Sequence, residues 1–183
     1  SVKSNEMKNT FKLFFFLLLF NNFSLLANDH IDKKIFNIIN GVYEVESWFD
    51  GKKLHKSPLV SGRWTFYEGQ VISIIHNRIN PDNYKSSVRW GKGLVKDKKF
   101  KYTYTESLNI KGNEKFSTFN TKLLFDGMRN FDVFLNNNEI KMVSENKNQV
   151  WTINEKGMVY NDKEWGEDKI FVERKWKRLK PIK

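Results

Sequence analysis

Short runs of aromatic and β-branched residues recur about every ten residues from Gly41 onward, and this spacing constrains the fold more than any other feature. Clusters of Gly, Asn, Asp and Lys close each run, as turn residues do between strands. No long stretch has the 3.6-residue period of an amphipathic helix. The pattern therefore predicts an all-β, antiparallel meander.

The predicted strands are short and follow one another without a domain break. They cover residues 42–49, 62–67, 71–77, 88–95, 100–108, 115–125, 131–135, 139–144, 149–154 with 158–160, and 169–178. Glu68-Gly69 has the composition of a two-residue hairpin turn. Residues 31–40 are expected to form a short helix that covers one end.

Alternation with a period of two assigns side chains to the two faces of each strand. The predicted inward residues are Tyr43, Val45, Ser47 and Phe49; Trp64, Phe66, Val71, Ser73 and Ile75; and Ile170, Val172, Arg174, Trp176 and Arg178. Glu44 and Glu46 fall on the opposite face, towards solvent. Periodicity alone does not decide whether such strands close into a barrel or stack as a sandwich.

The first segment has the order of a secretory signal peptide. Lys8 and Lys12 precede an apolar run over residues 13–20, and the segment ends at the small residue Ala27. A membrane span needs roughly 20 apolar residues, so this run is too short to remain as an anchor. We expect a cut after Ala27 and a secreted or periplasmic protein; the alternative is an uncleaved amphipathic anchor.

These features divide the chain into four parts. We expect an upstream extension with the signal peptide over residues 1–27, a lead-in segment over 28–40, a β-barrel over 41–179 and a basic tail over 180–183. No transmembrane span is expected after processing.

The chain has no cysteine, which excludes disulfides, zinc–thiolate and iron–sulfur sites, a cysteine nucleophile and lipoprotein attachment. It carries a net charge of +11 at neutral pH. The basic residues form two clusters, one of Lys96, Lys98, Lys99 and Lys101, the other of Arg174, Lys175, Lys177, Arg178, Lys180 and Lys183. Such clusters bind nucleic acid or anionic surfaces. Because secretion argues against nucleic acid, we expect an anionic envelope component as partner, or simply a solvated basic surface.

The two ends of the predicted barrel resemble a known family. Gly41-Val42-Tyr43 is similar to the Gly-x-Trp opening of lipocalins, with Tyr in place of Trp, and Trp176-Lys177-Arg178 is similar to the Trp-x-Arg close of bacterial lipocalin-like domains. The segments 62–66, 78–82 and 107–109 fall between them in the expected order. This resemblance implies an antiparallel up-and-down calycin-type barrel of about 8–10 strands.

The resemblance also implies that the last strand pairs with the first. Arg178 then lies over the ring of Tyr43 at the closed base, a cation–π contact worth about 0.5–2 kcal/mol. Gly41, Tyr43, Trp176 and Arg178 are therefore expected to close the barrel.

A barrel of this family holds a small molecule in its interior. The aromatic side chains expected to line the pocket are Phe49, Trp64, Phe66 and Trp90. Arg89 and Tyr104 are expected to supply polar contacts, with His76 at the mouth. The interpretation that competes with a pocket is a solid barrel filled by these side chains.

We expect a non-catalytic binding protein for a small hydrophobic or amphipathic molecule, without cofactor or metal. His30, His55 and His76 lie in unrelated contexts, and no phosphate-binding glycine loop or His-Glu-x-x-His motif is present in the sequence. Two alternatives remain open. One is an enzyme, such as an isomerase, a cyclase or a cofactor-binding enzyme, on the same barrel. The other is an envelope interaction module that uses its basic outer face.

Overall fold

The computed structural model describes residues 29–123 and 127–180. The predicted signal peptide and its cut after Ala27 lie outside these residues, as does Lys183. A helix over residues 29–39 precedes twelve strands. The strands are β1 (Gly41–Phe49), β2 (Leu54–His55), β3 (Val60–Tyr67), β4 (Gln70–Asn77), β5 (Tyr84–Lys96), β6 (Lys99–Gly112), β7 (Ser117–Leu123), β8 (Arg129–Asn136), β9 (Glu139–Ser144), β10 (Gln149–Ile153), β11 (Gly157–Trp165) and β12 (Ile170–Arg178).

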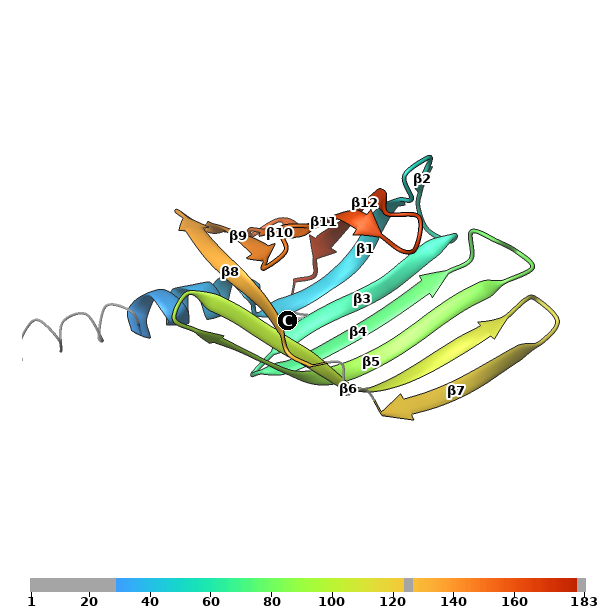
Figure 1. Cartoon of the computed structure of the whole chain (residues 1–183), viewed down its shortest axis with the longest axis horizontal. Coiled ribbons are helices and arrows are strands. Elements are labelled where there is room, and N and C mark those ends of the chain that lie inside the picture. The colour runs from blue at the N-terminus through green and yellow to red at the C-terminus, as the bar shows by residue number, and fades with distance from the viewer. Residues whose placement is uncertain (1–28, 124–126, 181–183) are drawn as a thin grey trace, which may run out of the picture.

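Ten of these strands close into an antiparallel up-and-down barrel, which confirms the predicted fold class. Neighbours in the ring follow the chain order β1, β3, β4, β5, β6, β8, β9, β10, β11 and β12, and β12 pairs with β1 to complete it (Figure 1). β2 and β7 lie outside the ring on β1 and β6. In the predicted hairpin turn between β3 and β4, both Glu68 and Gly69 have the positive φ that a type I′ turn requires.

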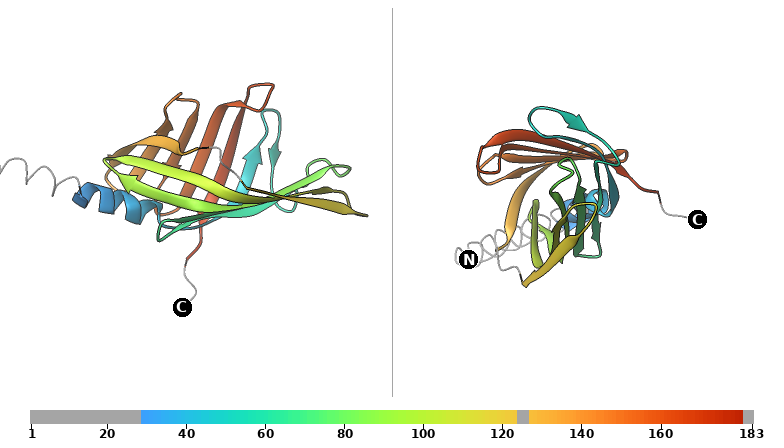
Figure 2. Two further views of the ribbon diagram at one scale, coloured as in Figure 1. Left: turned by 60° about the horizontal axis from the view of Figure 1, so that its bottom comes forward. Right: turned by 90° about the vertical axis from the view of Figure 1, so that its right-hand side faces the viewer.

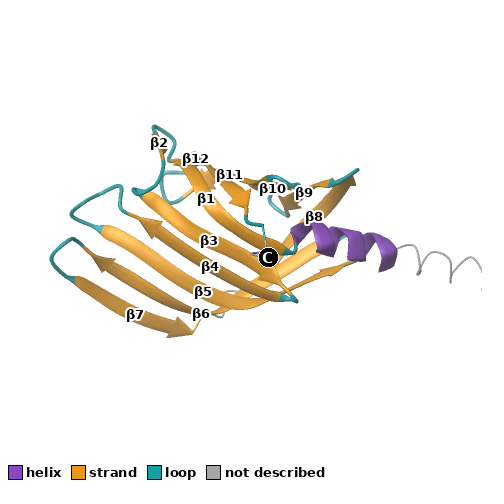
Figure 3. Cartoon of the chain, turned by 180° about the vertical axis from the view of Figure 1, so that it is seen from behind, coloured by secondary structure: helices purple, strands orange, loops and turns teal. Residues whose placement is uncertain are grey.

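The helix over residues 29–39 covers one end of the barrel (Figure 3). Ile35 and Ile39 on its inner face are fully buried. The ring of Phe36 packs edge-on against Phe66 of β3, with 5.2 Å between ring centroids. The helix therefore closes this end with apolar side chains, as expected for residues 31–40.

Tyr43 and Arg178 join the barrel seam to that helix. The two residues are paired between β1 and β12, and the Arg178 guanidinium lies 4.8 Å from the Tyr43 ring centroid. Arg178 donates hydrogen bonds to the Tyr43 hydroxyl (2.6 Å), to the carbonyl of Asn40 (2.9 Å) and to that of Ile38. The Tyr43 hydroxyl donates to the carbonyl of Ile39 (2.8 Å). Because the last carbonyls of a helix have no partner within it, this pair caps the helix and fixes it to the seam.

A β-bulge in β1 changes which side chains face inward. The register with β12 shifts between Val45 and Ser47, so Trp48 is paired with Arg174 on the inner face. Phe49, which strict alternation places inside, is instead paired with Glu173 and its ring lies 6.3 Å from that of Phe171 on the outer face. The inward placement predicted for Phe49 is therefore wrong, because one extra residue reverses every face beyond it.

β5 and β6 are longer than the sequence predicted, and with β7 they project beyond the rest of the barrel (Figure 2). The first part of β6 pairs with β8 to form the ring, whereas its last part pairs with β7. The projection lies at the end of the barrel opposite the helix. No helix within the described ranges is long and apolar enough to cross a membrane.

Candidate ligand cavity

A cavity lies inside the ring, towards the end that the helix leaves open. The inward side chains of β4 lie one after another from the closed end of the barrel to the open end. Val71 is fully buried at the closed end and Ser73 is 9% exposed, while Ile75 and then Asn77 lie nearer the open end. Ser73, Ile75 and Asn77 line the cavity, whereas Val71 lies in the core below it. The barrel is therefore filled in one half and hollow in the other.

Aromatic packing forms the floor of the cavity. Trp64 packs against Trp151, with ring centroids 5.5 Å apart, and against Phe100 at 6.5 Å. Phe131 packs edge-on against Trp151 at 6.3 Å. Trp64 and Trp151 belong both to this core and to the cavity lining, so they separate the two halves.

The cavity has a volume of about 530 Å³, within the usual range of roughly 300–1,000 Å³ for small-molecule sites. Its wall combines aromatic side chains with polar and charged ones. Five of the six tryptophans line it, together with three tyrosines: Trp48, Trp64, Trp151, Trp165, Trp176, Tyr102, Tyr104 and Tyr160. Such a wall suits an apolar or aromatic molecule.

Three arginines reach this aromatic wall from three different strands: Arg89 from β5, Arg129 from β8 and Arg174 from β12. The guanidinium of Arg174 lies 3.9 Å from the ring centroid of Trp48 and 4.5 Å from that of Trp165. Arg129 lies 5.4 Å from the ring centroids of both Tyr102 and Tyr104. The cavity thus combines apolar surface with cations stacked on it.

Burial shifts the pKa values of groups in this wall. It lowers the pKa of Arg174 to about 10, which leaves the guanidinium charged at neutral pH. Burial raises the pKa of Tyr104, although Ser73, Trp64 and the charges of Arg129 and Arg89 act against it. Burial also raises the pKa of Tyr160, and the nearby charge of Asp162 adds to the effect. Both tyrosines therefore present neutral hydroxyl groups.

Asp162 shares the inward face of β11 with Tyr160 but is not among the residues that line the cavity. It is 4% exposed and accepts hydrogen bonds from the Tyr160 hydroxyl (2.9 Å), the Gln149 side-chain amide (3.1 Å) and the backbone N–H of Glu164 (2.9 Å). These donors stabilise its buried charge. Asp162 therefore holds Tyr160 in place at the cavity wall.

The structure brings together some of the residues predicted to bind a ligand. Trp64, Arg89 and Tyr104 line the cavity. Phe66 is fully buried in the closed half, where it packs against Phe100 with 5.3 Å between ring centroids. It therefore belongs to the core and not to the cavity lining.

The structure places the remaining three predicted residues on the outer face. Phe49 lies outside because of the bulge in β1. Trp90 is 38% exposed, since its neighbour Arg89 points inward and alternation turns Trp90 outward. His76 pairs with Ser86 across the outer face, where its Nδ1 lies 2.9 Å from the Ser86 hydroxyl. The pocket assignment of Phe49, Trp90 and His76 is thus corrected.

Several cavity residues were not predicted. Trp48 was missed because the bulge was not visible in the sequence. Trp151 and Tyr160 share a face with the buried Ile153 and Met158 on β10 and β11, so the same period-two analysis extended to these strands would have found them. Arg129 begins β8 and has no local sequence signal, because its aromatic neighbours come from β6.

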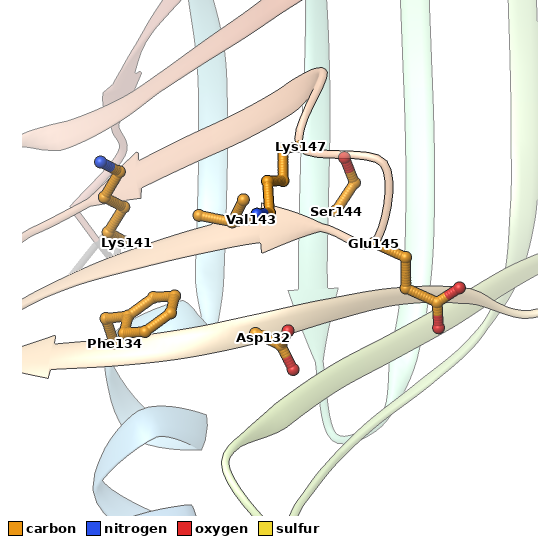
Figure 4. A pocket seen from close by; sticks show the side chains of 7 residues that line it. All are labelled: Asp132, Phe134, Lys141, Val143, Ser144, Glu145 and Lys147. Carbon is orange, nitrogen blue, oxygen red and sulfur yellow. The ribbon is translucent and has the colours of Figure 1, made fainter.

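A second hollow, of about 350 Å³, lies on the outer face of β8 and β9 (Figure 4). Phe134, which is 60% exposed, and Val143 supply its apolar surface. The carboxylate of Asp132 in this hollow forms an ion pair with Lys99 at 2.6 Å. Charges here are thus compensated and solvated, unlike those of the interior.

The predicted C-terminal basic cluster is divided between the two faces of β12. Arg174 and Arg178 point into the barrel, whereas Lys175 and Lys177 form ion pairs on the outer face with Glu173 (3.4 Å) and Glu44 (3.0 Å). Glu44 faces solvent as predicted, and the pKa of its carboxyl is lowered by Lys177 and, more weakly, by Arg63.

No family model matches the chain, and no curated protein or solved structure matches it either. Within residues 29–123 and 127–180, no three His, Asp or Glu side chains gather in a group that would hold a metal ion. The cavity is therefore the feature of the molecule from which a function can be inferred.

Proposed function

We propose that the chain is an exported, lipocalin-like binding protein that holds a small amphipathic molecule in the barrel interior without transforming it. The observation that carries this proposal is the half-filled barrel, in which an aromatic floor ends and a cavity of about 530 Å³ begins. A barrel that served only as a scaffold would gain stability by filling this space with side chains.

The sequence supports the same proposal. Its opening and closing segments resemble those of lipocalin-like domains, and the barrel is closed by pairing those two segments, β1 with β12. The ring has ten strands, whereas lipocalin barrels have eight, which makes room for a wider interior. Export rests on the predicted signal peptide over residues 1–27.

A neutral fluorescent probe, N-phenyl-1-naphthylamine, tests the proposal. The probe is apolar and aromatic, so it should bind the cavity with one site per chain, measured by its fluorescence increase. Ser73→Phe fills the cavity from β4 and should abolish binding. Ile72→Phe makes the same kind of change at the adjacent, outward residue, which is 41% exposed, and should bind as the wild type does.

Both variants should retain the circular dichroism spectrum of the wild type. Saturable 1:1 binding that Ser73→Phe alone removes supports an interior site. If the folded wild type does not bind the probe, or if Ser73→Phe binds it unchanged, the interior is not a ligand site.

A further inference from the structure

The side chains that line the cavity include basic residues but no acidic ones. The residues that line it include three arginines and two lysines, Arg89, Arg129, Arg174, Lys85 and Lys111, and neither an aspartate nor a glutamate. The charge of the buried Asp162 acts on Arg174, but the oxygens of Asp162 already accept three hydrogen bonds from the protein. A surplus of cations along a cleft attracts anions.

Arg174 is the clearest case. Its guanidinium lies against two indole rings, those of Trp48 and Trp165, which are perpendicular to each other. Its Nε is buried without a hydrogen-bond acceptor among the described residues, and none of the ion pairs within these residues includes it. Removing a charged donor from water without giving it an acceptor costs free energy. A ligand that supplies the missing acceptor recovers this cost and therefore binds more tightly.

The rest of the wall is also short of acceptors. The Nε of Arg89 and the indole N–H groups of Trp48, Trp151 and Trp176 are buried without a partner within the described part of the chain. An ionised carboxylate or sulfonate is an acceptor-only group whose oxygens match the parallel N–H bonds of a guanidinium. A neutral acceptor would form weaker hydrogen bonds with these donors than an anion does, and a cationic ligand would be repelled.

We propose that the molecule bound in the barrel is an organic oxyanion, with its anionic group held by Arg174 and Arg89 and its apolar body packed on the surrounding tryptophans and tyrosines. This inference rests on the proposed binding function and adds the chemical class of the ligand. Arg129 adds positive charge to the same wall, because its charge and that of Arg89 both act on the hydroxyl of Tyr104.

Two probes that differ only in charge test the inference. 1-Anilinonaphthalene-8-sulfonate is N-phenyl-1-naphthylamine with one added sulfonate. The difference in affinity between the two probes therefore measures how much the sulfonate contributes to binding. Charge-assisted hydrogen bonds to the arginines predict that the wild type binds the sulfonate about tenfold more tightly than the neutral probe. Both dissociation constants are measured by fluorescence titration of the full chain.

Arg174→Gln removes the charge and should lower the affinity for the sulfonate about tenfold. Its affinity for the neutral probe should fall by a smaller factor, so the preference for the sulfonate over the neutral probe should shrink. Lys175→Gln is the matched control, because it makes the same change in charge at the adjacent residue on the outer face, where the side chain is 52% exposed. This control should bind both probes as the wild type does.

Equal affinity of the wild type for both probes would overturn the oxyanion assignment while leaving the binding function intact. An equal loss for both probes in folded Arg174→Gln would also overturn it, since Arg174 would then only shape the cavity. Failure of the wild type to bind either probe would instead contradict the proposed function itself. The comparison of the two probes in the wild type keeps the inference testable if Arg174→Gln does not fold.

Discussion

Tyr43→Phe is expected to weaken the closed end of the barrel by the loss of a single oxygen atom. The Tyr43 side chain is fully buried, and its hydroxyl donates to the carbonyl of Ile39 and accepts from Arg178. Phenylalanine keeps the ring beneath the guanidinium and removes both hydrogen bonds. The helix carbonyl of Ile39 then loses a donor, and Arg178 loses one of its acceptors.

The magnitude follows from these two contacts. A neutral buried hydrogen bond contributes about 1 kcal/mol, and one with a charged partner about 1.5–3 kcal/mol. Arg178 keeps the carbonyls of Asn40 and Ile38 as acceptors, so the loss of its hydrogen bond to Tyr43 costs an amount at the lower end of the range for charged partners. We therefore expect the free energy of unfolding to fall by about 2–3 kcal/mol.

Urea unfolding followed by tryptophan fluorescence measures this change. With a denaturant dependence of about 2 kcal/mol per molar, the midpoint should move down by roughly 1 M with an unchanged slope. Tyr67→Phe is the control, since Tyr67 is 59% exposed on β3 and should lose less than about 0.5 kcal/mol. Equal stability of Tyr43→Phe and Tyr67→Phe would refute the role given to this hydroxyl.

Three further predictions concern stability. Burial raises the pKa of Tyr43 from 10.0 to about 12. The contribution of its protonated hydroxyl to the free energy of unfolding is therefore complete below pH 10, and it is lost at about 1.4 kcal/mol per pH unit between pH 10 and 12. Tyr43→Phe should flatten this part of the stability–pH curve. Burial acts to raise the pKa of Asp50, but hydrogen bonds from Lys53, His55 and Lys52 outweigh it and hold the value at about 2. The free energy of unfolding of the wild type should therefore fall by about 1 kcal/mol as the pH falls from about 4 to 2. Urea titrations of Asp50→Asn should not show this fall. Gly91→Ala should cost about 2–3 kcal/mol because its Cβ would lie 1.9 Å from the backbone oxygen of Thr103, whereas Gly93→Ala, whose Cβ would first meet a side-chain methyl at 3.1 Å, should cost less.

The strand pattern and the closed end were predictable from the sequence because both depend on local or terminal signals. Alternation identified the inward faces of β3, β4 and β12, where Trp64, Val71 and Trp176 are buried. The two ends could be joined because an antiparallel seam brings the end of the last strand beside the start of the first, which places Arg178 at Tyr43. These inferences needed no knowledge of the barrel interior.

The cavity was only partly predictable. The bulge between Val45 and Ser47 has no distinct composition, yet it exchanges Phe49 for Trp48 on the inner face. Arg174 was assigned correctly to the inward face of its strand, but the sequence also grouped it with the outer lysines. Its aromatic neighbour Trp165 is on the adjoining strand β11, whereas Trp48 is far away in the chain, on β1. Only the pairing of β12 with β1, which closes the ring, brings Trp48 to Arg174.

Native mass spectrometry of the protein recovered after export from its own host tests the central claim most directly. The proposed function predicts one small-molecule adduct per chain that organic extraction removes, and the extracted molecule should be an organic acid. Ser73→Phe, prepared in the same way, should lack the adduct, while Ile72→Phe should keep it. An adduct retained in full by folded Ser73→Phe, or a bare wild-type chain that also fails to bind N-phenyl-1-naphthylamine, would contradict an interior ligand site.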